Sequence, residues 1–207
     1  MAYIELVSRT YNTLTCGVVG LPSWVAGINW YIGTSTGSMP FNQSRDAANT
    51  TWTFERVEHP ERPGTGFAMT NNTLYFVKFA AYDANGVRHD DLQPVITDCF
   101  ATLWEWDSDV TAGAEFGITA AEFNRFIDLV FAADAGIATA AQTAQKLTGS
   151  ASQYYVTRNT GMLASQVNNV RSLIATLGAS VPSAAVRGGR IKASFFNGLV
   201  SSLYTLI

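Results

Sequence analysis

The chain has 207 residues, of which 47% are hydrophobic and 14% are charged, and its formal net charge is −3. Affinity for nucleic acid comes mainly from concentrated Lys and Arg, so this charge and the lack of a basic run argue against a phosphate-binding surface. No apolar run reaches the roughly 20 residues that cross a bilayer, which predicts that no segment inserts into a membrane. With so few charges, much of the surface is neutral, and such surface is often buried against partners.

Short β-rich runs, separated by Gly, Pro, Asn and Ser, occupy the chain from Ile4 to about Thr97. This pattern indicates an antiparallel β-sandwich, and none of the runs has the length or period of a helix. The expected strands are Ile4–Thr10, Thr13–Val19, Gly27–Gly33, Thr50–Val57, Leu74–Tyr82 and Gln93–Thr97.

The clearest strand lies within Thr73–Gly86. Tyr75, Val77 and Phe79 alternate with other residues and therefore share one face of the strand. The Asn-Gly pair at 85–86 tolerates positive φ, which predicts a tight turn after the strand. The segment therefore predicts one strand of a hairpin.

The same segment resembles the penultimate strand of a fibronectin type III or related immunoglobulin-like domain. The residues that carry this resemblance, ahead of the Asn-Gly turn, are Thr73, Tyr75, Val77 and Ala81. It implies that Tyr75 is the tyrosine-corner residue, whose hydroxyl bonds to backbone upstream.

The resemblance also implies the roles of earlier segments. Leu14–Val18 corresponds to the second strand and Ile28–Ile32 to the third, with Trp30 in the core. The chain departs from the family pattern in two ways: its second strand lacks the usual Trp, and the segment Glu58–Asn72 is longer than the family's tight turn.

The two cysteines, Cys16 and Cys99, are expected to be free thiols. A disulfide needs Cα atoms within about 7 Å of each other, whereas Cys16 lies in an expected strand and Cys99 at the junction between the halves. Free thiols suit a reducing cytoplasm. Met1–Arg9 has neither a basic n-region nor an apolar h-region, so no secretion signal is expected.

The second half of the chain carries one pattern three times: apolar, any, Ala, small, any, apolar, Asn, any, apolar, and an apolar residue at the end. The copies span residues 118–130, 162–174 and 191–203. Between the first two copies, Ala132–Leu147 is rich in Ala and is expected to be helical.

In the first copy the apolar residues follow a helical period. Phe123, Phe126 and Val130 are spaced by three and four residues, so they share one face of a helix and must be buried. Thr119 and Glu122 form a capping-box pattern at the start of this helix.

Asn124, Asn168 and Asn197 occupy the same position of the three copies, next to the apolar stripe. Their amides could bond to a neighbouring backbone or to a partner helix. One interpretation makes them polar boundary positions, and the other makes them contacts that fix register, as buried Asn does in coiled coils.

The apolar stripes and their Asn residues are expected to meet other protein surfaces. The expected assembly residues are Phe123, Asn124, Phe126, Val167, Asn168, Phe196, Asn197 and Leu199. The expected fold is therefore an α+β multidomain protein: an immunoglobulin-like antiparallel β-sandwich at 1–98, then an α-helical assembly domain at 99–207.

The repeated helix-start pattern resembles one found in structural proteins of tailed bacteriophages and related contractile particles. The resemblance implies a virion structural protein, such as a tail, fibre or decoration component, that assembles in the host cytoplasm. It implies other virion proteins as partners and a homo-oligomer. The helices would anchor the protein, and the sandwich would project toward a neighbour or toward the host surface for attachment.

An enzyme is not expected. His59 and His89 are the only histidines, and the sequence contains no HExxH, Gly-x-Ser-x-Gly, Walker A or paired-Cys motif. No catalytic residue, cofactor or metal is therefore assigned. The carboxylates and amide near Asp83 and Asp91 could in principle hold Ca²⁺, but their spacing lacks the glycine and distal Glu of a helical calcium hand, which favours a solvated hairpin tip.

One end of the expected sandwich is a candidate glycan site. In an immunoglobulin-like topology the loops around Trp24 and around Asp83–Asp91 emerge at the same end. An exposed Trp beside polar groups suits a sugar ring. The candidate ligand-binding residues are Trp24, Asp83, Asn85, His89 and Asp90. The alternative is that Trp24 covers the edge of the core. A bacterial surface or carbohydrate-binding module is the second functional interpretation.

Overall fold

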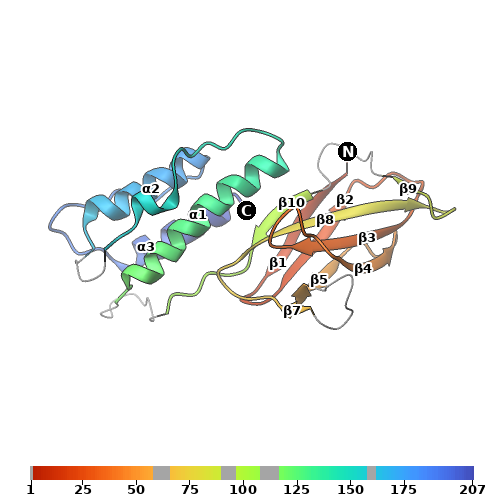
Figure 1. Cartoon of the computed structure of the whole chain (residues 1–207), viewed down its shortest axis with the longest axis horizontal. Coiled ribbons are helices and arrows are strands. Elements are labelled where there is room, and N and C mark those ends of the chain that lie inside the picture. The colour runs from red at the N-terminus through yellow and green to blue at the C-terminus, as the bar shows by residue number, and fades with distance from the viewer. Residues whose placement is uncertain (1, 58–65, 90–96, 108–116, 158–161) are drawn as a thin grey trace. The chain divides into compact units, whose positions relative to one another are not determined.

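The computed structural model describes residues 2–57, 66–89, 97–107, 117–157 and 162–207 of the chain. They belong to two compact units, Met1–Leu103 and Trp104–Ile207. Antiparallel sheets build the first unit and three α-helices the second, which confirms the expected α+β class (Figure 1).

Within the described part of the first unit, the strands form two antiparallel sheets and one short strand pair. In the smaller sheet, β2 (Leu14–Val19) lies between β1 (Tyr3–Arg9) and β5 (Trp52–Phe54). The larger sheet has the order β10 (Thr97–Ala101), β8 (Leu74–Asp83), β3 (Val25–Gly33) and β4 (Phe41–Asp46), and β9 (Arg88–His89) pairs with β8. β6 (Arg56–Val57) pairs with β7 (Phe67–Ala68).

Most expected strands are present, with bounds that differ by a few residues. The expected run Thr50–Val57 divides into β5 and β6, which pair with different strands. β4 was not expected because its sequence is polar and has no β-branched residue; it forms through its ladder with β3. Residues 93–96 of the run Gln93–Thr97 lie outside the described residues, and Thr97 begins β10.

The first unit extends beyond Asp98, where the sequence placed its end. β10 pairs with β8 as far as Ala101, opposite Leu74. Two residues later, the backbone N–H of Leu103 donates to the carbonyl oxygen of Thr10 at 2.9 Å. These backbone bonds tie the segment up to Leu103 to the sheets.

One hydrophobic core draws residues from both sheets. Leu14 of β2 and Phe54 of β5 are fully buried in the same cluster as Trp30 of β3 and Phe79 of β8. Trp30 meets Phe54 edge to face, with ring centroids 5.7 Å apart, and its burial confirms its expected place in the core. Each side chain of this size contributes about 1.5–3 kcal/mol through burial.

Two local predictions for β8 are also confirmed. The backbone N–H of Thr70 donates to the Tyr75 hydroxyl at 3.0 Å, which is the expected bond to upstream backbone. At the other end of the strand, Gly86 has a φ of 77°, and its N–H donates to the carbonyl oxygen of Asp83 at 3.0 Å. A residue with a side chain would be strained at that φ.

The three helices of the second unit are α1 (Ala120–Ala140), α2 (Ala164–Leu177) and α3 (Ala193–Tyr204). Each begins at the Ala in the third position of the repeated pattern. The predicted capping box is confirmed: the backbone N–H of Glu122 donates to Thr119 Oγ1 and that of Thr119 donates to Glu122 Oε2, both at 3.2 Å. None of the helices in the described ranges is both long and apolar enough to cross a membrane.

The prediction that the helix at Ala132–Leu147 extends to Leu147 is wrong. α1 continues through the first copy and stops at Ala140, and a short 3-10 helix follows at Ala151–Tyr154. Buried Asp134 explains the early end, because its carboxylate accepts the backbone N–H groups of Lys146 and Leu147, each at 2.9 Å. These bonds hold the chain turned back against α1.

Candidate functional site

The expected apolar assembly residues belong to the core of the second unit, Trp104–Ile207, which is called the helical unit below. Phe123, Phe126 and Phe196 are buried, and the ring centroid of Phe123 lies 6.5 Å from that of Phe126 and 6.0 Å from that of Phe196. Val167 and Leu199 are buried as well. This differs from the expectation that the stripes meet another subunit, because three amphipathic helices within one unit supply each other's apolar partners.

The Asn residues of the first two copies bind backbone of their own chain. The Asn124 amide nitrogen donates to the carbonyl oxygen of Val156 at 3.1 Å, and its amide oxygen accepts the N–H of the same residue at 2.8 Å. Asn168 makes the same pair of bonds with Ala185, at 2.9 and 2.8 Å. Asn197 of the third copy is exposed. The interpretation of a bond to neighbouring backbone therefore holds for Asn124 and Asn168.

These two pairs share a register that the sequence alone did not reveal. Val156 lies six residues before the second copy, which begins at Met162, and Ala185 lies six residues before the third, which begins at Ile191. Each helix thus holds the segment that leads into the next helix. The repeated Asn was visible in the sequence. Its partners were not, because they are backbone groups that any residue could supply.

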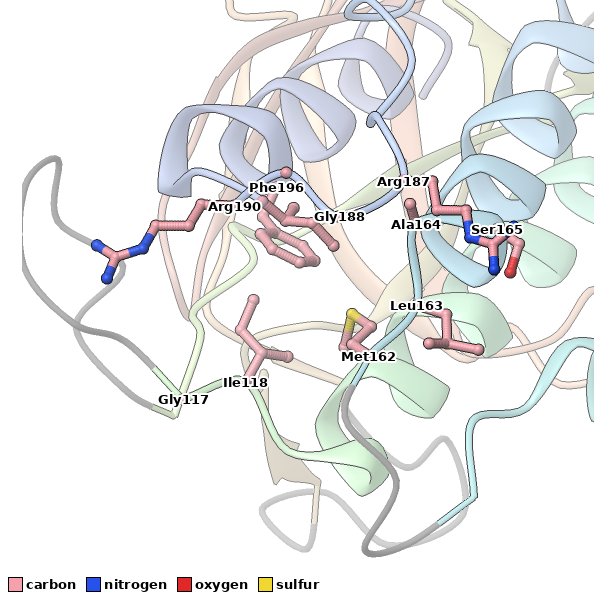
Figure 2. Close-up of a pocket in the computed structure, with 12 residues that line it drawn as sticks. Gly117, Ile118, Met162, Leu163, Ala164, Ser165, Arg187, Gly188, Arg190 and Phe196 are labelled. Atoms are coloured by element: carbon pink, nitrogen blue, oxygen red, sulfur yellow. The ribbon is translucent and has the colours of Figure 1, made fainter.

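An open cavity of about 1030 Å³ lies where the three copies begin. The first residue of each copy lines it: Ile118, Met162 and Ile191. Figure 2 shows Ile118, Met162 and Phe196 pointing toward the same space. Leu163, another lining residue, is 60% exposed. The sequence repeat therefore brings three separate apolar residues to one surface site.

The rim of this cavity is positively charged and the floor is apolar. Arg187 and Arg190 line it, and their guanidinium groups point away from the centre (Figure 2). α2 and α3 carry no acidic residue in their first turns, so the partial positive charge of their amino-terminal ends is not offset there. This site was not predicted from the sequence, because the apolar stripe draws attention to the helix faces rather than to the residues that precede each helix.

At one end of the first unit (the β unit, Met1–Leu103), the side chains of three of the five candidate ligand-binding residues lie together. Trp24 is 41% exposed, and its ring centroid lies 4.4 Å from that of His89. His89 Nε2 is 3.5 Å from Asp83 Oδ2. Asn85 contributes its backbone N–H to Asp83, and Asp90 lies outside the described residues.

The Asp83 carboxylate is used by the turn that follows it. Its Oδ1 accepts the backbone N–H groups of Val87 and Asn85, each at 2.9 Å. These hydrogen bonds, with that of Val87 the strongest influence, lower the pKa of Asp83. Asp83 therefore shapes the hairpin tip, and its Oδ1 is already used by backbone N–H groups.

The described titratable groups form neither a metal site nor a reactive thiol. Within the ranges that the structure describes, no three His, Cys, Asp or Glu side chains are placed to hold a metal ion. Cys16 and Cys99 are free and buried, and burial raises the pKa of Cys99 to about 12 and that of Cys16 further. A thiol with so high a pKa is not a nucleophile at neutral pH.

No protein-family model and no curated protein sequence matches the chain. Among solved structures, it is similar to pectate lyase PelI from Erwinia chrysanthemi, with 18% identity, a TM-score of 0.31 and coverage of 42% of this chain and 24% of that one. It is also similar to pectate lyase Pel3 from Pectobacterium carotovorum, with 13% identity, a TM-score of 0.34 and coverage of 55% and 32%. The chain thus spans less than a third of either lyase, and TM-scores this low assign neither fold nor function.

Proposed function

We propose that the chain is a non-catalytic structural component of a tailed-bacteriophage or phage-like particle, assembled in the host cytoplasm. The helical unit attaches to neighbouring virion proteins, including further copies of the chain. The β unit projects toward a neighbour or toward the host surface. The observation that carries this proposal is the open apolar cavity at the starts of the three helix copies.

The cavity suits attachment to another protein. Interfaces gain most of their affinity where a few apolar side chains fill a well-packed pocket surrounded by a polar rim. Here Ile118, Met162 and Phe196 form the apolar floor, and Leu163 is exposed beside them. Arg187 at the rim favours a partner segment that carries acidic residues next to its apolar ones.

The two Asn pairs support the same role. Because Asn124 and Asn168 fix the segments that lead into α2 and α3, the residues at the start of each following copy are held in place before a partner arrives. Such preorganisation lowers the entropic cost of binding. A rigid surface of this kind favours repeated assembly contacts over turnover of a substrate.

The β unit is proposed to be an immunoglobulin-like sandwich. Its smaller sheet, β1–β2–β5, and its larger sheet, β10–β8–β3–β4, contribute to one core, and the Tyr75 hydroxyl bonds to Thr70 upstream. These features are typical of immunoglobulin-like domains, which often act as projecting binding modules.

The test is to purify intact particles from a producing host and to quantify this chain in them by mass spectrometry. In particles made with Leu163→Asp, incorporation should fall at least tenfold, because the new charge lies in the apolar contact. Val186→Asp is the matched control: Val186 is 74% exposed in the same unit but does not line the cavity. Thermal unfolding of both purified variants checks that they fold.

Absence of the wild-type chain from particles would contradict the proposed function. Normal incorporation of Leu163→Asp would contradict the cavity as the attachment site.

A second candidate function is a bacterial surface or carbohydrate-binding module, which the exposed Trp24 beside His89 favours. On an array of cell-surface glycans, the wild-type protein should then bind as a monomer, and Trp24→Ala should lose binding. Unchanged glycan binding by Trp24→Ala would remove this candidate.

A further inference from the structure

A second groove, of about 550 Å³, lies on the β unit between β4 and β5. It is formed by side chains from both strands and from the residues on either side of β5. The residues that line it are Gln43, Arg45, Thr51, Trp52, Thr53, Glu55 and Arg56. None of them belongs to the cavity of the helical unit or to the Trp24 end.

Arg45 in this groove has a donor without an acceptor. Its Nε is buried and forms no hydrogen bond, and no acidic side chain in the described ranges forms an ion pair with it. Buried polar groups in folded proteins nearly always have a partner, so a ligand that brings an acceptor to this guanidinium would be favoured.

Trp52 holds this guanidinium in a fixed orientation. The Arg45 Cζ lies 4.0 Å from the centroid of the Trp52 ring, and Trp52 itself packs against the hydrophobic core. A guanidinium stacked on an aromatic ring keeps its edge N–H groups available in a planar fork. That fork matches the two oxygens of a carboxylate.

The other polar groups of the groove narrow the class of ligand. Glu55 accepts hydrogen bonds only, and Gln43 both donates and accepts, so these side chains suit hydroxyl groups. Glu55 would also repel a ligand with several closely spaced negative charges. A molecule with one carboxylate for Arg45 and hydroxyl groups for Gln43 and Glu55 satisfies these three side chains.

We propose that this groove binds an acidic saccharide through the carboxylate of a uronic-acid residue, which Arg45 receives. This groove suits a carboxylate ligand better than the end of the β unit that carries Trp24, because the charged group there, Asp83, is an acceptor already bonded to backbone N–H groups. The inference goes beyond the proposed function, and the isolated chain tests it without any particle.

The probe is a hyaluronan hexasaccharide, which carries carboxylates without sulfate, titrated into the full chain by isothermal calorimetry at low salt. Arg45→Gln should raise the Kd at least tenfold, and Arg45→Lys, which keeps the charge without the planar fork, should raise it severalfold. Arg125→Gln is the charge-matched control, because Arg125 lies in the other unit and pairs with Asp107. Circular dichroism and thermal unfolding of each variant check the fold.

Three outcomes would overturn the inference: no binding of the hexasaccharide by the wild-type chain, equal affinity for its carboxyl-reduced neutral form, or equal loss of affinity in Arg125→Gln. Binding of a hexaglutamate peptide as tightly as the saccharide would assign the groove to acidic peptides instead. If Trp24→Ala loses binding and Arg45→Gln keeps it, the glycan site lies at the Trp24 end and the groove is not used.

Discussion

Asn124 binds both backbone groups of a single residue, Val156, which lies 32 residues further along the chain. The side-chain amide thus makes the two hydrogen bonds that a neighbouring β-strand would make with this N–H and carbonyl oxygen. Asn168 does the same for Ala185. Because Val156 is buried, its backbone groups would be costly to leave without partners.

Replacing either of these asparagines should destabilise the helical unit. Asn124→Ala and Asn168→Ala each remove two backbone hydrogen bonds and leave their partners unsatisfied, which should lower the free energy of unfolding by about 1–3 kcal/mol. Urea unfolding measures the change. Asn169→Ala is the matched control, because Asn169 is exposed on the same helix and Ala is the better helix former. Equal effects at 168 and 169 would contradict the role of the backbone bonds.

The hydroxyl of Tyr75 should contribute to the stability of the β unit. Tyr75→Phe keeps the buried ring but removes the acceptor for the Thr70 N–H, so the free energy of unfolding should fall by about 1–2 kcal/mol. Tyr3→Phe is a suitable control, since Tyr3 is exposed. Denaturant titration followed by Trp fluorescence compares the two, and a neutral result for Tyr75→Phe would argue against a tyrosine corner.

Asp134 should be needed to end α1 correctly. In Asp134→Asn one carboxylate oxygen becomes an amide nitrogen, which cannot accept the N–H of Lys146 or Leu147. We expect a loss of about 1–3 kcal/mol, measured by thermal and urea unfolding. Asp128→Asn on the same helix should have a smaller effect, because Asp128 is exposed. If both variants behaved alike, the buried bonds of Asp134 would not be decisive.

The buried thiols predict a loss of stability at alkaline pH. The folded pKa of Cys99, about 12, lies above the unfolded value of about 8.5, so the contribution is complete below pH 8.5 and is lost as the pH rises toward 12. Each thiol can contribute up to about 1.4 kcal/mol per pH unit in this window. Urea unfolding at pH 7.5 and 10 should show the loss.

The Cys16→Ala, Cys99→Ala double variant is the control for that experiment, because it retains every other titrating group. It should lose less stability between the two pH values than the wild type. Equal losses in both proteins would show that the thiols do not contribute. Native protein at pH 7.5 should also leave both thiols unreacted with a disulfide reagent until it unfolds.

Sequence patterns predicted the parts of the fold that depend on neighbouring residues. The alternation around Val77 predicted β8, and Thr119 with Glu122 predicted the start of α1. β4 was missed because its pairing with β3, rather than its own composition, makes it a strand. The end of α1 was missed for a similar reason, since Asp134 acts through backbone that lies twelve and thirteen residues away.

The candidate sites were harder to predict than the elements. The repeated pattern contained Ile118, Met162 and Ile191, but their periodicity gave no sign that they share one cavity, because that depends on how three helices pack. Arg45 and Trp52 belong to strands of different sheets. Their stacking depends on how the two sheets are arranged, so no sequence pattern predicts it. The proximity of Trp24 and His89 was predicted from the loop positions of an immunoglobulin-like topology, and their ring centroids lie 4.4 Å apart.

Val156 and Ala185 lie at the same distance in sequence before the next helix copy, and this indicates where the chain can change length. The stretch between α1 and Val156 is longer than the one between α2 and Ala185, yet the distance in sequence from each held residue to the next copy is the same. Insertions and deletions upstream of the held residue should therefore leave the following helix in place. An epitope tag or a reporter peptide inserted upstream of the held residue should therefore be tolerated. One inserted within the six residues that follow it would shift the next helix.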